Sequence, residues 1–92
     1  MKVMVTWSAQ SGQFSEAVSR FLAGQAVPPD GLTLLGRWHS VDIGSGFVLF
    51  ETNDATLIYK NSVKWADVLD IQVSLVVEDN EAAPILTELY KQ

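Results

Sequence analysis

Hydrophobic and polar positions along this chain change their period in a regular order. Residues 2–8 alternate, which predicts a strand, whereas the apolar residues from Phe14 to Leu22 recur at helical spacing and predict an amphipathic helix. Two further apolar stretches, 32–41 and 47–52, flank a glycine-containing segment. Their arrangement predicts two strands joined by a hairpin turn.

The second half of the sequence predicts a helix, a strand and a last helix. Asn53 or Asp54 is suited to cap the first of these helices, because its side-chain oxygen can accept from free backbone N–H groups. Residues 68–77 are nearly continuous in apolar and β-branched side chains, which is typical of a strand covered on both faces. The acidic run 78–81 then favours a helix start, and Pro84 is tolerable there if it lies in the first turn.

This order of elements predicts an α+β, ferredoxin-like fold over residues 1–92: βαββαβ with an antiparallel four-stranded sheet, plus a C-terminal helix. Right-handed crossovers place the first and third strands in the centre and both crossing helices on one face. The other face is then bare, and apolar side chains from the set Val73, Leu75 and Val77 would lie in water. A second copy packed sheet against sheet would bury them, so we expect a homodimer.

Composition narrows the partners and the chemistry. The net charge is −5 and the six Lys and Arg residues are scattered, which argues against nucleic acid and anionic membranes as partners. The chain has no Cys and a single His, and no loop has calcium-site spacing, so we expect no metal and no cofactor. No segment approaches the ~20 apolar residues of a membrane span, and the N-terminal apolar run is too short for a signal peptide. We therefore expect a cytoplasmic protein.

The stretch Arg37-Trp38-His39 is the first candidate for chemistry. A hairpin that turns near Gly44 puts Arg37 opposite Glu51 and places His39 on the same face, with Trp38 on the other. Such a polar cluster at the end of an apolar pocket suits an anion or a carbonyl, with His39 as the candidate catalytic proton-transfer group. The alternative is a cross-strand ion pair with a hydrogen-bonded His at a dimer rim, which we favour because structural ion pairs outnumber catalytic ones.

Aromatic side chains offer a second candidate, a cavity for a flat ligand. Trp7 and Trp65 are its main predicted lining residues, together with Trp38, Phe50 and Tyr59. The alternative is that these side chains serve core and interface packing, where aromatic residues carry much of the buried area. We favour packing.

Several strings of residues resemble one bacterial family. The most specific are Gly36-Arg37-Trp38-His39 and the Trp-Ala-Asp-x-Leu-Asp pattern of residues 65–70, and the opening 1–7 agrees. Together they resemble the domain-of-unknown-function family 3303 (DUF3303) over nearly the whole chain. The resemblance implies a dimeric α+β barrel, in which two ferredoxin-like subunits pack sheet against sheet. It implies no activity and transfers no catalytic residue.

Two functions of different class therefore stay open. The first is a homodimeric small-molecule-binding or structural module with an apolar pocket for a small apolar or aromatic ligand. The second is a cofactor-free, monooxygenase-like enzyme acting on an aromatic substrate, with His39 as acid and base and Trp38 or Trp7 shaping the pocket. We favour the first, because no catalytic dyad or triad can be recognised in the sequence.

Overall fold

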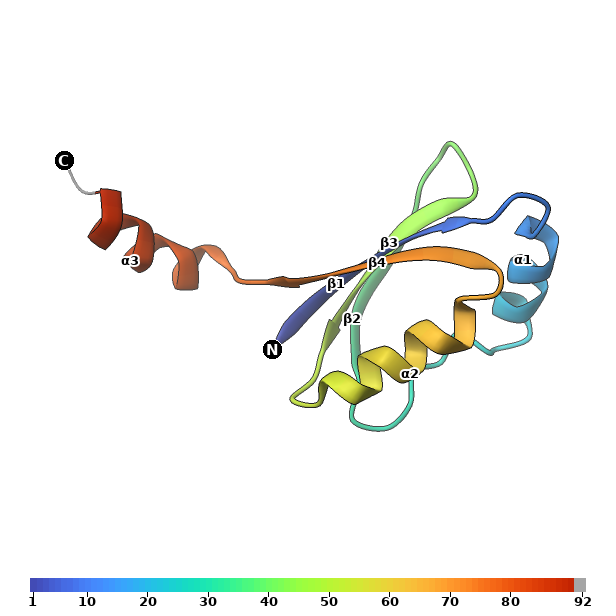
Figure 1. Cartoon of the computed structure of the whole chain (residues 1–92), viewed down its shortest axis with the longest axis horizontal. Helices are drawn as coiled ribbons and strands as arrows, with labels where there is room; N and C mark the ends of the chain where they lie inside the picture. The colour runs from blue at the N-terminus through green and yellow to red at the C-terminus, as the bar shows by residue number, and fades with distance from the viewer. Residues whose placement is uncertain (91–92) are drawn as a thin grey trace.

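A computed structural model describes residues 1–90 and contains the predicted elements in the predicted order. In chain order they are β1 (Lys2–Ala9), α1 (Phe14–Leu22), β2 (Thr33–His39), β3 (Ser45–Glu51), α2 (Ala55–Trp65), β4 (Leu69–Val76) and α3 (Asp79–Tyr90). The strands form one antiparallel sheet in the order β2-β3-β1-β4, so the first and third strands are central, as predicted. The α+β, ferredoxin-like prediction is confirmed (Figure 1).

Local signals set most helix ends. Gly24 adopts a left-handed φ of 81° just beyond α1, a conformation that glycine takes without strain. The Asp54 side chain caps α2 by accepting from the Thr56 N–H at 2.9 Å. Glu81 accepts from the backbone N–H of Glu78 at 3.0 Å, so its side chain supports the start of α3.

Pro84 is the exception among these local signals. It lies inside α3 rather than in its first turn, which differs from the sequence expectation. A proline there lacks the N–H that would continue the hydrogen-bond ladder. The last helix is therefore intrinsically weaker than its length indicates.

The hydrophobic core lies between α2 and the central strands. Its buried members come from β1, β3, α2 and the loop before β2: Val3, Val5, Leu32, Val48, Phe50 and Ile58. The strand members lie in register across the sheet, since Val3 pairs with Phe50 and Val5 pairs with Val48. The buried side chains of α2 pack on the sheet face formed by these four residues, which we call the helix side.

The β2–β3 hairpin turns earlier than the sequence predicts. The Ser40 N–H donates to the Ser45 carbonyl at 2.9 Å, and His39 pairs with Gly46. Arg37 consequently pairs with Val48, and the prediction that it lies opposite Glu51 is wrong. The odd shift exchanges the faces, so Arg37 and His39 lie on the helix side and Trp38 lies on the opposite, open face.

Close contacts explain why Gly46, which the sequence places in the turn, is a strand residue. A Cβ at this position would lie 2.3 Å from the Trp38 carbonyl oxygen and 2.6 Å from the Trp7 ring. The glycine therefore admits a close approach of neighbouring strand and indole rather than a tight turn. The turn itself uses Ile43 and Gly44, with φ values of 71° and 86°.

The open face of the sheet is covered by no other element in the described part of the chain. Its clearest apolar feature is the stack of Trp38 on Phe47, with ring centroids 5.1 Å apart and both side chains exposed. Val73 and Leu75 were expected here, but their register with Val5 and Val3 puts them on the helix side. They are exposed because β4 is an edge strand that α2 covers incompletely.

Helix α3 stands away from the rest of the molecule, beyond the end of β4 (Figure 1). The molecule measures 52 × 31 × 18 Å and its radius of gyration is 15.6 Å. A compact domain of this length has a radius of gyration of about 12 Å. The apolar side chains of α3, Ile85, Leu86 and Leu89, are all more than half exposed.

Candidate functional site

An apolar pocket of about 340 Å³ lies between α1 and the helix side of the sheet. Strand residues form its floor, α1 forms its roof, and α2 closes one end. The main contributors are Val5, Trp7, Val48 and Phe50 from the floor, Phe14, Ala17, Val18 and Phe21 from the roof, and Asn61 and Trp65 from α2.

Helix α1 covers this pocket without filling it. Its apolar residues lie on one side, as the helical spacing predicts, yet none of its side chains is buried. Phe14 is 45% exposed and Phe21 is 38% exposed, although both line the pocket. The apolar stripe of α1 therefore faces a hollow instead of a packed core.

Polar contacts outside the pocket hold α1 against the end of α2. Arg20 makes a bidentate ion pair with Asp67, with Nη2–Oδ2 and Nη1–Oδ1 distances of 2.6 and 3.0 Å. Glu16 accepts from Arg20 Nε at 3.2 Å. The Arg20 guanidinium lowers the pKa of Asp67, and the hydrogen-bonded Asp67 carboxylate raises the pKa of Arg20. Lys64 also donates to the Gln25 carbonyl, which anchors the segment after α1.

Arg37 lies on the pocket wall and is partly buried. Its Nη2 donates to the Ala26 carbonyl at 2.8 Å, and the guanidinium carbon lies 5.5 Å from the centre of the Phe21 ring. Partial burial lowers the pKa of Arg37, because desolvation disfavours the charged form. Within residues 1–90, no carboxylate pairs with this guanidinium.

His39 stands two residues further along β2 and also lines the pocket. Its ring makes edge contacts with Trp7 and Phe21, at centroid distances of 5.4 and 5.3 Å. These two aromatic rings come from the floor and the roof, so His39 lies at the junction between them. A group in this position can contact a bound molecule and the solvent.

The structure brings together four of the six predicted site residues. Trp7, Arg37, His39 and Trp65 line the pocket, whereas Trp38 and Glu51 do not. The predicted cluster of Arg37, His39 and Glu51 is absent, because the hairpin register places Glu51 on the open face. Of the other aromatic candidates, Phe50 lines this pocket, whereas Tyr59 lies outside it and is 73% exposed.

Glu51 belongs instead to a charged group at the end of the open face. It pairs with Lys2 at 3.8 Å and with the Met1 amine at 3.5 Å, and Lys2 also pairs with Glu78 at 3.1 Å. The hydrogen bond to Glu78 and the nearby Glu51 raise the pKa of Lys2. This partly exposed cluster ties β1 to the connection before α3 and is separate from the pocket.

The roof is the part of the site that sequence reasoning missed. Phe14, Ala17, Val18 and Phe21 form the apolar stripe that the spacing predicts, but the sequence marks none of them as a site residue. The same spacing serves a helix over a core and a helix over a hollow, so periodicity does not separate them. Ala26 and Asn61 carried no signal in the sequence.

Among residues 1–90, no three His, Cys, Asp or Glu side chains gather in an arrangement that could hold a metal ion. Across the same residues, no helix combines the length and the apolar character needed to cross a bilayer.

Comparisons with known proteins identify a family and nothing closer. The model of a family described as "Domain of unknown function (DUF3303)" matches residues 1–90. The resemblance inferred from the sequence strings is thereby confirmed. Neither a search of curated proteins nor a search of solved structures found a match to this chain.

Proposed function

We propose that this chain, which belongs to the DUF3303 family, binds a small apolar molecule in the pocket beneath α1 as one half of a homodimer. The observation that carries the proposal is the unfilled pocket of about 340 Å³. Ligand pockets of proteins occupy roughly 300–1,000 Å³ and are largely apolar with a few polar groups. The lining here has that composition, with Arg37, His39 and Asn61 among aromatic and aliphatic side chains.

The binding proposal is tested with a neutral bicyclic probe such as 2-naphthamide. We expect saturable binding by calorimetry. The Ala17→Phe variant, which extends a side chain from the roof into the hollow, should abolish this binding while the protein stays folded. Val41→Phe is the matched control, because Val41 is fully exposed in the hairpin loop. Unchanged binding by Ala17→Phe would reject the proposal, and so would failure of the natural protein to bind both this probe and its carboxylate analogue, 2-naphthoate.

The dimer proposal rests on the amount of surface left exposed. The accessible surface of the chain is 6476 Å², whereas a compact monomer of this mass exposes about 5,300 Å². The excess, about 1,200 Å², is more than the ~800 Å² that each partner contributes to a standard interface. The open face with Trp38 and Phe47, and the apolar side of α3, supply this surface. We infer that two copies pack through their open faces and that α3 of each copy lies on the other.

The oligomeric state tests this second part. A native mass spectrum of the gently purified protein should show a dimer, and any added mass would identify the class of molecule in the pocket. Phe47→Glu and Leu86→Glu should each give monomers, whereas Val41→Glu should not. A monomeric natural protein would reject the dimer and leave the pocket proposal standing.

A cofactor-free oxygenation of an aromatic substrate is the alternative function. His39 is the residue that would carry its proton transfer, and its place on the pocket wall supports this alternative. His39→Ala would then remove turnover of such a substrate without unfolding the protein. Binding remains the conclusion, because the described residues give His39 no carboxylate partner to orient it.

A further inference from the structure

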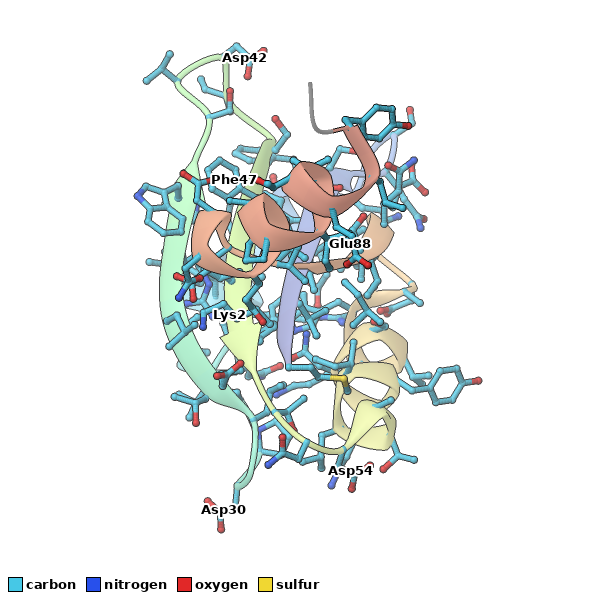
Figure 2. The ribbon with its side chains drawn as sticks, turned by 90° about the vertical axis from the view of Figure 1, so that its left-hand side faces the viewer. Lys2, Asp30, Asp42, Phe47, Asp54 and Glu88 are labelled. Carbon is cyan, nitrogen blue, oxygen red and sulfur yellow. The ribbon has the colours of Figure 1, made fainter. Side chains whose placement is uncertain are left out.

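The pocket of this acidic protein contains no carboxylate. The chain has eleven Asp and Glu residues against six Lys and Arg, yet none of the acidic side chains among residues 1–90 lines the pocket. Figure 2 shows Asp42 at the top of the view and Asp30 and Asp54 at the bottom. Arg37 is therefore the one fixed charge among the lining residues of the described chain.

The surroundings of Arg37 leave its charge uncompensated. Within residues 1–90, the guanidinium contacts a neutral carbonyl, that of Ala26, and the face of the Phe21 ring. Burial lowers the pKa of a cation that lacks a nearby anion, as it does for Arg37. A guanidinium carries five N–H donors in a fixed fork, so most remain available to a carboxylate that enters the pocket.

We infer that the occupant of the pocket is a small aromatic carboxylate whose acid group is bound by Arg37. This inference deepens the proposed binding function and depends on it. The apolar part of the ligand would lie among Val48, Phe50 and Trp65, and the carboxylate would complete the hydrogen bonding of the guanidinium. Charge-assisted, bidentate hydrogen bonds of this kind are about twice as strong as neutral ones.

The size of the pocket limits the aromatic part to about two rings. An apolar cavity of about 150 Å³ is large enough to hold benzene. The present pocket, at about 340 Å³, has a little more than twice that volume. A bicyclic aromatic acid fits this space, whereas long-chain acids exceed it.

The test compares two probes of the same shape, 2-naphthoate and 2-naphthamide, by calorimetry on the natural protein at pH 7. We expect the anion to bind at least about ten-fold more tightly, because hydrogen bonds to charged groups are the stronger class. Arg37→Gln should reduce naphthoate binding to the level of naphthamide. Lys60→Gln, which removes an exposed charge of α2 outside the pocket, should leave the preference unchanged.

The outcomes separate the two proposals. Equal binding of both probes to the natural protein would overturn the carboxylate inference and leave the binding function intact. Failure of both probes to bind would overturn both. A preference lost equally in Lys60→Gln would show a general effect of net charge and would also overturn the assignment to Arg37. The probe comparison requires no variant, so it tests the preference for a carboxylate even if Arg37→Gln fails to fold.

Discussion

The two helices on the helix side of the sheet cover it in different ways. Helix α2 buries Ile58 and Trp65, which are 6% and 8% exposed. Helix α1 has the more sharply segregated apolar stripe and buries none of its side chains. The space between α2 and the sheet is therefore filled with side chains, whereas the space between α1 and the sheet is a covered pocket.

This difference shows that an amphipathic helix does not by itself imply a packed core. The α2 half holds its helix through apolar contacts, whereas the α1 half relies on Arg20, Asp67 and other polar contacts at its edge. Because the polar contacts that hold α1 lie outside the pocket, they leave its interior unfilled. Substitutions matched between the two halves test this description.

Truncating one apolar side chain in each helix should give the largest difference in the free energy of unfolding. Ile58→Ala removes a buried side chain and should lower the free energy of unfolding by about 2–5 kcal/mol. Phe14→Ala, in the roof, should lower it by less than about 1 kcal/mol, because the side chain is 45% exposed and lines the pocket. Urea denaturation at equilibrium measures both. Similar losses for the two variants would show that α1 is packed after all.

The floor of the pocket should resist added volume even though the roof does not. Gly46→Ala places a methyl group against the Trp38 carbonyl and the Trp7 ring, which should cost about 1–3 kcal/mol. Gly36→Ala is the comparison, since its Cβ would meet only the outer atoms of the Trp38 indole on the open face. That ring can move, so the smaller loss is expected there. Thermal unfolding of both variants tests the order.

Enlarging a side chain should destabilise the protein in the core under α2 and stabilise it in the pocket under α1. Val3→Leu overfills the core and should destabilise the protein by about 1–3 kcal/mol. Ala17→Leu extends into the hollow and should stabilise it by about 0.5–2 kcal/mol, as cavity-filling substitutions do. Urea denaturation of both variants is the measurement. Destabilisation by Ala17→Leu would mean that the hollow closes in solution.

The ion pair between Arg20 and Asp67 should make a small, pH-dependent contribution to the free energy of unfolding. Arg20 lowers the pKa of Asp67 in the folded protein below its ordinary value of 3.8, so the ion pair contributes its full stability above that value. This contribution is lost as the pH falls through the lowered pKa. The difference in unfolding free energy between the natural protein and Asp67→Asn should therefore shrink from pH 6 to pH 2.5. Arg20→Gln should remove the same pH dependence, and a difference that persists at low pH would contradict the assignment.

The sequence predicts those features that depend on neighbours along the chain. The Asp54 cap and the stop at Gly24 follow from side-chain and backbone preferences, and the order of strands follows from handedness. The family match adds that these patterns are recognisable over residues 1–90.

The candidate site is predicted only in part, because it depends on properties that neighbours along the chain do not fix. The sheet face on which Arg37 lies depends on the register of the hairpin, and a shift of one residue changes it. Gly46 has the residue type of a turn, yet it lies in a strand, where it permits a close contact with Trp38 and Trp7. The pocket exists because α1 lies at a distance from the sheet. The helical spacing of apolar residues from Phe14 to Leu22 does not determine that distance. The sequence thus places Arg37 and His39 with a wrong partner, Glu51.

The register of the β2–β3 hairpin has a consequence for how relatives of this chain diverge. Loss or gain of one loop residue between Ser40 and Gly44 would turn Trp38 inward and carry Arg37 and His39 to the outer face. A single-codon insertion or deletion would then exchange a cationic pocket wall for an aromatic one while every strand residue stays the same. Loop length is therefore the character to compare first among members of the family.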